Sequence, residues 1–586
     1  MIPTLQRNSN TSGPSAIFSL LAQSSLVPEV ATGSSTPTLT RATTAYVTDW
    51  EGLLKPVLSG ESRFTGARRV QNLLTGSSID IFAAPWGHDT QGTGTHSRTL
   101  NYATAPDGTT TAVRYQWSNG GTAANWTRFY QSIGTARSSG ISSVWLKSNT
   151  GSSQTIYLFD PGPSTAVLCT VTTTWQRFVS NTRTSGLSQY FGYVAAGVVG
   201  NCTTDGDILV WGSMGEEITG QSNQNPSEYV SVGVLSAPYH GAGVDGVKYF
   251  TTLNGNTVSS NVVTEATGVA IKPTNGSSAT TTDASGPFGY LSEIQSINLL
   301  TFSNDVTNAA WVKTTMTTAL TSTGPDGVPN SATRCTASAG NALALQTYVA
   351  AASSRTYSVW VKRITGTGNF QLTQDGTTFT TVTTTAGWTQ VQLNASQLNA
   401  VLGFRIVTNG DAFDIWCNGF EAGAIATSPI PTTTVAVTRN ADSLTYAISG
   451  NMLTATGAYY SEWTCPANAT YPRIITSAAA NEAAYFSSST QLNLTDGTQR
   501  NLNTTTLPKT TPTKFATTWG GTSSFGSLAG VASADGGFDG TLIGAGTNFG
   551  IGAWDGGTGY ELNGTVRNVK IYAATQTTTQ LNALTA

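Results

Sequence analysis

The sequence predicts an all-β protein made of several sandwich domains. Charged residues make up only 10% of the chain, against about 25% in an average protein, so Thr, Ser, Asn and Gly must supply the polar surface. Thr is β-branched and suits a pleated strand, while the 62 Gly suit the turns between strands. The 14 Trp and 20 Tyr indicate packed cores rather than disorder. The chain has 586 residues, which is room for about three to five domains.

Two stretches of the chain carry the same landmarks in the same order. Asn72-Leu-Leu-Thr75 corresponds to Asn298-Leu-Leu-Thr301, and Pro106-Asp-Gly108 corresponds to Pro325-Asp-Gly327. The offset between the copies falls steadily from 226 to 205, as loop deletions would cause. Four pairs of Trp keep this order, and Trp is too rare for chance to explain them. The pairs are Trp86 with Trp311, Trp145 with Trp360, Trp175 with Trp388, and Trp211 with Trp416.

The landmarks within each copy lie in segments that read as strands. Ser143-Val-Trp-Leu-Lys-Ser148 alternates polar and apolar residues, as does Trp175-Gln-Arg-Phe-Val-Ser180. Pro-Asp-Gly is a turn signal, because Pro fixes the entry angle and Gly supplies a positive φ. Many strands with frequent turns predict an antiparallel sandwich. The size of each copy fits a jelly roll of about eight or more strands.

These patterns divide the chain into four parts. Residues 1–40 form an N-terminal anchor or tether, either a disordered tail or a docking peptide that orders on a larger assembly. Residues 41–240 form the first module with its lead-in strands, and residues 241–440 form the second module with a lead-in insertion. Residues 441–586 do not repeat the module and form a third sandwich, which ends in a short helical turn near Thr577.

Composition also excludes several kinds of partner. The net charge of −3 predicts no face for nucleic acid. No run approaches the roughly 20 apolar residues of a membrane span, so membrane insertion is not expected. The three His are too few and too scattered to predict a metal site, and no cofactor is expected. The Asp-Gly stretches 534–540 and 554–559 could ligate Ca²⁺, although turns are the favoured interpretation. The five Cys are expected to be free thiols, with Cys169 and Cys202 as a possible pair.

The carboxylates near the end of the first module do not form a catalytic pair. Glu216 and Glu217 are adjacent, and neighbouring residues of a strand point to opposite faces, whereas a glycosidase needs two carboxylates that flank one cleft. Glu216 recurs as Glu421, five residues after Trp211 and Trp416 respectively. This repetition predicts a structural role, such as bonding a loop amide. We therefore expect a protein that is not an enzyme.

Sugar binding by sandwich proteins depends on exposed aromatic faces with amides and hydroxyls nearby. The candidates are the aromatic residues that the two copies do not share, with core or interface positions as the alternative for each. They are Trp117, Trp126, Tyr459, Tyr460, Trp519, Trp554 and Tyr560.

The first module resembles modules found in virion proteins of tailed bacteriophages, which look like carbohydrate-binding jelly rolls. The residues that carry this resemblance are Arg41-Ala-Thr-Thr-Ala-Tyr46, Asn72-Leu-Leu-Thr75, Trp86, Pro106-Asp-Gly108, Ser143-Val-Trp-Leu-Lys147, Thr174-Trp-Gln-Arg-Phe178 and Leu209-Val-Trp-Gly-Ser-Met-Gly-Glu216. The ending Leu562-Asn-Gly-Thr-Val-Arg-Asn-Val-Lys-Ile-Tyr572 resembles the last strand of a concanavalin A/laminin-G-like sandwich. The second copy departs from the module pattern where Gly212 becomes Cys417.

The resemblance implies a structural protein on the surface of a phage virion, such as a tail fibre or spike, assembled in the host cytoplasm. Its N-terminal segment would attach to other virion proteins, and its sandwiches would attach to a host-surface polysaccharide. A homotrimer is expected by analogy with fibres. Three alternatives remain: a capsid decoration or head-fibre protein without a ligand, a capsule depolymerase, and a secreted bacterial adhesin.

Overall fold

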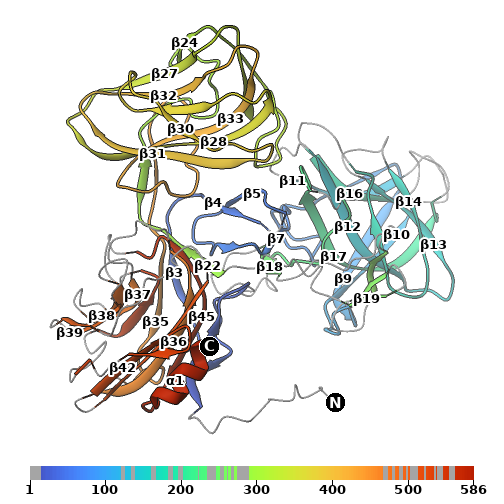
Figure 1. Cartoon of the computed structure of the whole chain (residues 1–586). Coiled ribbons are helices and arrows are strands. Elements are labelled where there is room, and N and C mark those ends of the chain that lie inside the picture. Colours follow the sequence, from blue (N-terminus) through green and yellow to red (C-terminus); the bar gives the residue numbers. More distant parts are fainter. Residues whose placement is uncertain are drawn as a thin grey trace.

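The structure is a computed structural model, and it describes most of the chain. The residues that it does not describe are 1–14, 50, 120–125, 134–138, 160–165, 183–188, 196–201, 222–223, 234–245, 251–256, 260–261, 265–269, 274–288, 454, 466–472, 478–481, 487–491, 497–498, 502–511, 521–522, 534–535, 538–545 and 554–560. The regular structure of the described part is β-strand apart from one helix, α1 (Thr578–Thr585). The predicted all-β sandwich class is confirmed. Three lobes surround a small central set of strands (Figure 1).

The first module is a sandwich of two five-stranded antiparallel sheets. Their strand orders are β15-β12-β17-β10-β9 and β14-β13-β16-β11-β8. The strands are β8 (Gly87–Gln91), β9 (Thr95–Ala103), β10 (Ala112–Ser118), β11 (Trp126–Ile133), β12 (Gly140–Ser148), β13 (Gln154–Phe159), β14 (Val167–Val171), β15 (Gln176–Val179), β16 (Gln189–Ala195) and β17 (Asp205–Glu217).

The second module has the same topology, strand for strand. Its sheets are β31-β28-β33-β26-β25 and β30-β29-β32-β27-β24. Each strand from β8 to β17 therefore has its counterpart sixteen strand numbers later, from β24 to β33. The strands are β24 (Val312–Thr314), β25 (Met316–Ser322), β26 (Ala332–Ala337), β27 (Ala342–Tyr348), β28 (Ser353–Thr365), β29 (Phe370–Thr373), β30 (Thr380–Val382), β31 (Thr389–Gln397), β32 (Ala400–Ile406) and β33 (Ala412–Ala422).

The two modules also share a β-bulge in their longest strands. Trp145 pairs with Trp211 across β12 and β17, and the register shifts between Ser143 and Trp145. The same shift occurs in the second module beside the pair of Trp360 and Trp416. The bulge places Gly212 at φ +66° and Cys417 at φ +46°, a region that favours glycine. The second module therefore has Cys in place of Gly at this position, while the backbone keeps the same conformation.

An asparagine closes each module in the same way. The amide nitrogen of Asn72 donates to the carbonyls of Ser213 and Val230, and its oxygen accepts from the amides of Leu74 and Gly215. Asn298 makes the four equivalent bonds in the second module. Both side chains are buried. The Asn-Leu-Leu-Thr landmark is thus a clamp between the entry and exit segments of a module.

The third lobe is built from both end regions of the chain. Strand β1 pairs with β45, and Phe18 and Leu20 are fully buried in its core. The sheets are β2-β1-β45-β36-β41-β42-β43 and β3-β35-β44-β37-β38-β39-β40. The strands are β1 (Ala16–Leu21), β2 (Val30–Ala31), β3 (Thr38–Thr40), β35 (Ser443–Ala447), β36 (Thr456–Trp463), β37 (Arg473–Ser477), β38 (Glu482–Phe486), β39 (Leu492–Asp496), β40 (Gln499–Asn501), β41 (Thr513–Gly520), β42 (Ser523–Leu528), β43 (Val531–Ala532), β44 (Asn548–Ile551) and β45 (Gly564–Tyr572).

Two expectations about domain boundaries are corrected by this lobe. Residues 16–40 are not a free tether, because their strands lie in the sandwich of residues 441–586. Strand β22 also leaves the second module and pairs with β45. The predicted helical turn at the end of the chain is the eight-residue helix α1, which begins with a capping box between Thr577 and Gln580.

The lead-in segments of both modules meet in a central hub, which we define as residues 41–71, 247–250, 289–298 and 437–442. Its hairpin packs on the second module, where the rings of Tyr46 and Trp416 lie 5.9 Å apart and the amide of Leu54 donates to Pro325 O at 3.0 Å. The hub strands are β4 (Ala45–Thr48), β5 (Leu54–Val57), β6 (Phe64–Thr65), β7 (Arg68–Gln71), β18 (Val247–Phe250), β22 (Gly289–Ser292), β23 (Ser296–Asn298) and β34 (Val437–Arg439). A separate small sheet holds β19 (Thr257–Ser259), β20 (Val262–Thr264) and β21 (Ala270–Pro273).

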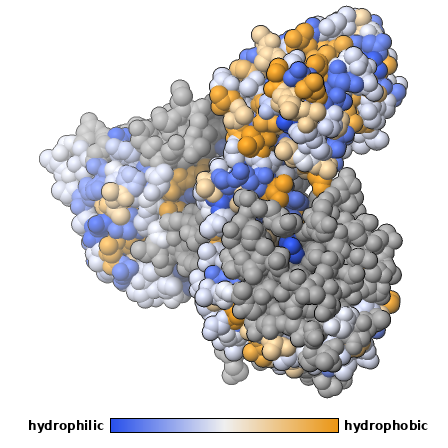
Figure 2. Space-filling model, turned by 90° about the vertical axis from the view of Figure 1, so that its left-hand side faces the viewer, coloured by the Kyte–Doolittle hydropathy of each residue, from blue (hydrophilic) through white to orange (hydrophobic). Residues whose placement is uncertain are grey.

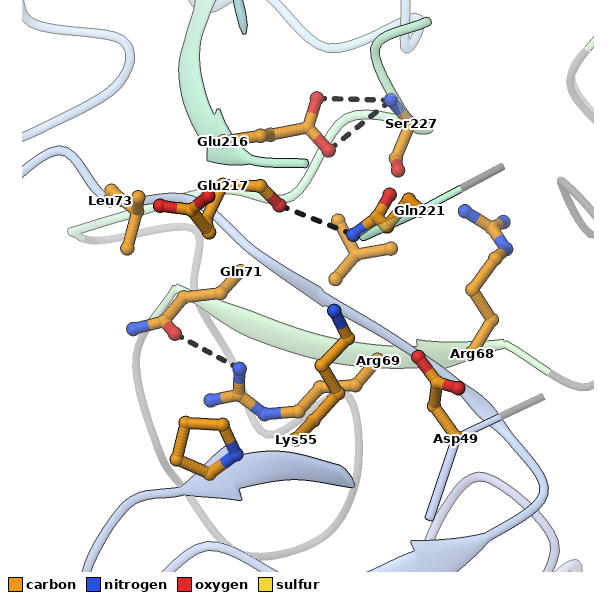
Figure 3. A pocket seen from close by; sticks show the side chains of 12 residues that line it. Asp49, Lys55, Arg68, Arg69, Gln71, Leu73, Glu216, Glu217, Gln221 and Ser227 are labelled. Atoms are coloured by element: carbon orange, nitrogen blue, oxygen red, sulfur yellow. Dashed lines mark hydrogen bonds between the residues drawn. The ribbon is translucent and has the colours of Figure 1, made fainter. Parts of the chain in front are cut away.

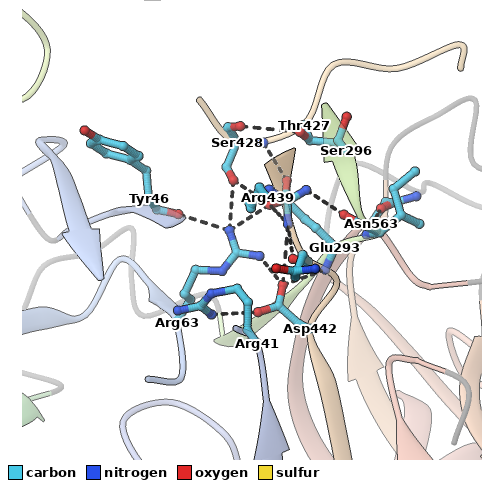
Figure 4. A network of polar contacts seen from close by, with 12 residues as sticks. Arg41, Tyr46, Arg63, Glu293, Ser296, Thr427, Ser428, Arg439, Asp442 and Asn563 are labelled. Atoms are coloured by element: carbon cyan, nitrogen blue, oxygen red, sulfur yellow. Dashed lines mark hydrogen bonds and ion pairs between the residues drawn. The ribbon is translucent and has the colours of Figure 1, made fainter. Parts of the chain in front are cut away.

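A buried ion-pair network ties together the hub segments that lead into the three lobes (Figure 4). Asp442 accepts from Arg41 at 2.8 Å and from Arg63, and Arg63 also donates to Glu293 at 2.7 Å. Arg439 lies 3.6 Å from Glu293. Burial by itself raises the pKa of Glu293, but Arg439 and Arg63 overcome this effect and lower it to about 2. All five residues lie in hub segments: Arg41 and Arg63 precede the first module, Glu293 precedes the second module, and Arg439 and Asp442 precede the third lobe.

Candidate functional site

The repeated tryptophans are scaffold residues. Trp86, Trp145, Trp211, Trp311 and Trp416 are buried, and Trp175, Trp360 and Trp388 are partly buried against the same modules. Two of them make an equivalent hydrogen bond, since the indole nitrogens of Trp86 and Trp311 each donate to the carbonyl nine residues earlier, at 2.8 and 3.1 Å. Their positions therefore fit the structural role expected from the repeat.

The repeated carboxylates bond loop amides, as the sequence predicted. Glu216 accepts from the backbone amide of Ser227 at 3.0 and 3.2 Å. Glu421 accepts from the amide of Thr427 at 3.3 Å and from the hydroxyl of Ser296 at 2.6 Å. Burial raises the pKa of Glu421, against the opposing effect of its hydroxyl donors. Each carboxylate closes the loop that leaves the last strand of its module.

Four of the predicted sugar platforms are buried, which corrects the expectation that they are exposed. Trp117, Tyr459, Tyr460 and Trp519 are between 0% and 6% exposed. The ring of Trp117 lies over Gly206, where a Cβ would come within 2.0 Å of it. The side chain of Trp126, which lies on β11, falls outside what the structure describes, as do Trp554 and Tyr560.

The burial of the two adjacent tyrosines has a clear physical reason. Neighbouring residues of a strand face opposite sides of a sheet, so one of the two should reach solvent if the sheet is covered on one side only. Strand β36 is covered on both sides. Tyr459 packs in the sandwich core, and Tyr460 packs with Leu581 beneath helix α1. Helix α1 therefore covers the side of the sheet on which Tyr460 would otherwise be exposed.

The structure contains a cleft between the hub and the first module (Figure 3). It encloses about 190 Å³. One wall comes from the hub strands and the other from the end of β17 with the loop that follows. The cleft is lined by Asp49, Lys55, Pro56, Arg68, Arg69, Val70, Gln71, Leu73, Glu216, Glu217, Gln221 and Ser227.

The arginines of the cleft are neutralised by acids that lie outside it. Arg69 donates to both oxygens of Glu61, at 2.6 and 2.9 Å. Arg68 pairs with Glu228 and lies over the ring of Phe250 at 4.7 Å. These pairs hold the guanidinium groups in place, so the arginines shape the wall of the cleft more than they add net charge to it.

The acids of the cleft are held by backbone amides. Asp49 accepts from the amides of Glu51 and Leu53, both at 2.9 Å, and Glu217 accepts from the amide of Thr219 at 3.1 Å. Burial raises the pKa of Asp49 to about 6, against the effect of Lys55, and burial lowers the pKa of Lys55. The cleft therefore offers polar groups to a small ligand. Its lining residues include no aromatic ring, so this described cleft has no platform for a sugar.

One exposed aromatic residue was missed by the sequence analysis. Tyr102 lies on β9 and is 42% exposed. The guanidinium of Arg114, on the neighbouring strand β10, lies 4.9 Å from the centre of its ring. The signal was available, since Tyr102 has no counterpart among the repeated landmarks and stands in a strand of mostly polar residues, Thr95–Ala103.

The described part of the chain also bears on the expectations about metals, membranes and disulfides. No cluster of three or more metal-ligating side chains occurs there, and no helix there is long and apolar enough to cross a membrane. Cys169 and Cys202, both in the described part of the chain, are not joined by a disulfide. The two Asp-Gly stretches considered for Ca²⁺ lie largely or wholly outside the described residues.

Comparisons with known proteins give similarities in parts of the fold. No family model matches the chain, and no curated protein matches it. Among solved structures, domain 4 of AbnA, a GH43 extracellular arabinanase from Geobacillus stearothermophilus, in complex with arabinotriose, is 14% identical and matches 28% of this chain and 84% of its own, with a TM-score of 0.22. The N-terminal CBM22-1-CBM22-2 tandem domain of Paenibacillus barcinonensis Xyn10C is 11% identical and matches 61% of this chain and 98% of its own, with a TM-score of 0.20. A Trypanosoma rangeli sialidase mutant is 11% identical and matches 24% of this chain and 25% of its own, also with a TM-score of 0.20. Scores this low carry no conclusion about function.

Proposed function

We propose that this chain is a structural protein of the surface of a tailed-phage virion, a fibre, spike or decoration. In this role it holds two copies of one sandwich module in fixed positions for attachment to a host-surface polysaccharide. The virion surface is then its location, and attachment to other virion proteins falls to the lobe that contains residues 15–40. A trimeric assembly remains part of the proposal.

The observation that carries this proposal is the buried hub network. Arg41, Arg63 and Arg439 surround Glu293 and Asp442, and all five side chains are at most 9% exposed. A buried charge network tolerates little change in geometry, because the loss of one partner leaves another charge unpaired. The network therefore favours a chain that holds its three lobes in one arrangement, which is what a display protein requires.

Polysaccharide attachment is the proposed role of the sandwich modules. Several copies of the chain in one assembly raise the avidity of weak sites by orders of magnitude. Four of the expected sugar-binding residues are buried, which argues against polysaccharide attachment: Trp117, Tyr459, Tyr460 and Trp519. This burial favours the second candidate, a decoration protein whose modules contact other virion proteins and no ligand.

We also propose that the chain is not an enzyme. Glu216, Glu217 and Glu421 each accept from a backbone amide of a nearby loop, and this use of the carboxylates supports a structural role. A capsule depolymerase would instead need a free pair across a cleft. Polysaccharide degradation by the full chain that is abolished in Glu216→Gln would overturn this part of the proposal.

Two experiments test the proposal as a whole. Gold labelling of a C-terminal tag, followed by imaging of phage particles, should place the label on the virion surface. Native gel electrophoresis of the full chain in gels that contain polysaccharides should show retardation by at least one of them. Surface labelling without retardation by any polysaccharide would favour the decoration protein. Secretion of the chain by bacteria free of phage, after removal of an N-terminal segment, would favour an adhesin.

A further inference from the structure

The outer face of one sheet in the first module carries an ordered polar patch. Strand β10 alternates, with Val113, Tyr115 and Trp117 in the core and Arg114 and Gln116 on the opposite face. On the neighbouring strand β17, Gly206 and Ile208 face the core, which places Asp207 beside Arg114 and Gln116. The patch therefore lies on the side of the sheet that faces away from the sandwich core.

Asp207 organises the patch. Its carboxylate accepts from Arg114 through Nε at 3.0 and 3.1 Å and through Nη2 at 2.5 Å, from Asn149 at 3.1 Å to each oxygen, and from Gln116 at 3.4 Å. Gln154 holds its backbone from both sides, at 2.7 and 2.5 Å. These bonds fix the polar groups before any ligand arrives, which lowers the entropic cost of binding.

Tyr102 supplies an aromatic surface at the edge of the same patch. The guanidinium of Arg114 lies 4.9 Å from its ring centre, so both side chains share the outer face. Tyr102 is 42% exposed, and the side chains of Arg114 and Asp207 are 26% and 16% exposed. From Tyr102 on β9 to Asn149 after β12, the patch crosses three spacings between strands, roughly 14 Å at about 4.8 Å each.

We propose that this patch binds a neutral polysaccharide, with Tyr102 beneath a sugar ring and Asn149, Gln116, Arg114 and Asp207 bonding its hydroxyl groups. The inference rests on the proposed attachment to polysaccharide and names the site where that attachment occurs. An aromatic ring beside fixed amides and a carboxylate combines an apolar contact for the C–H face of a sugar with donors and acceptors for its edge.

The charges of the patch select a neutral chain. Arg114 and Asp207 form an ion pair and cancel each other. Lys147, which lies opposite Leu209, and Asp205, which lies opposite Ser118, add one charge of each sign to the same face. A uronic acid or sulfate group near Arg114 would therefore meet a cation that is already paired with Asp207. No new ion pair would then compensate for the desolvation of its own charge.

The second module offers an internal comparison. Arg334 and Asp414 form an ion pair on the equivalent sheet, and the hydroxyl of Ser322 donates to Asp414 at 2.6 Å. The edge strand β25 carries Leu320 and Thr321 where β9 carries Leu100 and Tyr102. The arginine is thus shared by the two modules, but Asp414 takes the position of Leu209, and Ala412 takes that of Asp207. The aromatic surface also belongs to the first module. We assign the binding site to the first module for this reason.

The test uses affinity electrophoresis of the full chain in native gels that contain either neutral polysaccharides (dextran, a galactan, a mannan) or acidic ones (alginate, hyaluronan). Tyr102→Ala should weaken retardation by a neutral polysaccharide about tenfold. Tyr102→Phe should keep it, because the ring remains. Leu320→Ala in the second module is the matched control and should bind like the parent chain. Gln116→Ala should weaken binding by a smaller factor and reports on the polar part of the patch.

The outcomes separate this inference from the function on which it rests. Loss of binding in Tyr102→Ala together with full binding in Tyr102→Phe supports the site. Binding that Tyr102→Ala and Gln116→Ala leave unchanged, or binding to acidic polysaccharides alone, overturns the site and leaves polysaccharide attachment standing. Retardation by no polysaccharide overturns the proposed attachment, and the site with it.

Discussion

Removal of Asp442 should open the hub. Its carboxylate is fully buried and accepts from Arg41 and Arg63, so Asp442→Ala leaves two buried guanidinium groups without this partner. Breaking a buried pair in this way costs about 3 to 5 kcal/mol. Because 1.4 kcal/mol corresponds to a factor of ten, the population of molecules with an open hub should rise by roughly 10²- to 10³-fold. Glu462→Ala is the control, since its partner Arg567 is 37% exposed and such a surface pair contributes at most about 1 kcal/mol.

Trypsin provides the assay, because it cuts after Arg and the three arginines of the network, Arg41, Arg63 and Arg439, are buried in the closed state. Under native conditions, the cleavage rate at a protected site follows the population of the open form. Cleavage after Arg41, Arg63 and Arg439, identified from fragment masses, should accelerate by two to three orders of magnitude in Asp442→Ala. An acceleration below about tenfold, or one equal to that of Glu462→Ala, would refute the argument that the network fixes the lobes.

Three further predictions follow from the scaffold. Asn72→Ala and Asn298→Ala each remove four buried hydrogen bonds and should destabilise their own module by roughly 2 to 4 kcal/mol. Calorimetry of the full chain should show that each variant shifts a different unfolding transition. An equal shift of both transitions in each variant would contradict independent clamps. The pKa of Glu293 is about 2 in the folded chain, against an ordinary value of 4.5. Its contribution to the free energy of unfolding, up to roughly 3 kcal/mol, is therefore present above pH 4.5 and lost as the pH falls towards 2. Glu293→Gln should flatten the fall of the melting temperature below pH 4.5, and an unchanged slope would argue against this linkage. A fragment of residues 441–586 lacks β1 and β3 and should show no cooperative melting by circular dichroism, whereas fusion of residues 15–40 should restore it; cooperative folding of the short fragment would show that these strands are dispensable.

The repeat and the class of the fold could be predicted from the sequence because both depend on local patterns. Four tryptophan pairs and the Asn-Leu-Leu-Thr landmark mark positions that each module uses in the same way. Asn72 and Asn298 make the same four bonds, and Trp145 and Trp360 sit beside the same bulge. The role of Glu216 and Glu421 was predictable for the same reason, since a side chain kept at one distance from a core Trp serves the scaffold.

The domain boundaries could not be predicted, because the partners of the lead-in strands lie far away in the chain. Ala16 pairs with Tyr572, and Arg41 pairs with Asp442. Nothing in the local pattern of residues 16–40 distinguishes a tether from the edge strands of a distant sheet. Such pairings depend on which surfaces remain uncovered after each module has formed.

The sugar platforms were misjudged for a different reason. Residues that the two copies do not share were expected to be at the surface, but equivalent core positions can hold side chains of different size. The position of Trp117 on β10 is that of Ala337 on β26, and both are buried. The two cores are therefore filled by different combinations of residues, and a difference between copies is weak evidence of exposure.

The pairing of the two end strands has a mechanical consequence. Ala16 lies opposite Tyr572, so residues 41–440 form one large loop that this strand pair closes. A partner that binds strand β1 or strand β45 therefore binds the third lobe in either case. A pull on a polysaccharide held by the first module would then travel to that lobe through the hub, where Asp442 and Glu293 hold three arginines (Figure 4). The space-filling view shows the second module standing above the third lobe (Figure 2). The ion pairs of the hub, rather than either terminus, would set the force that the attached chain withstands.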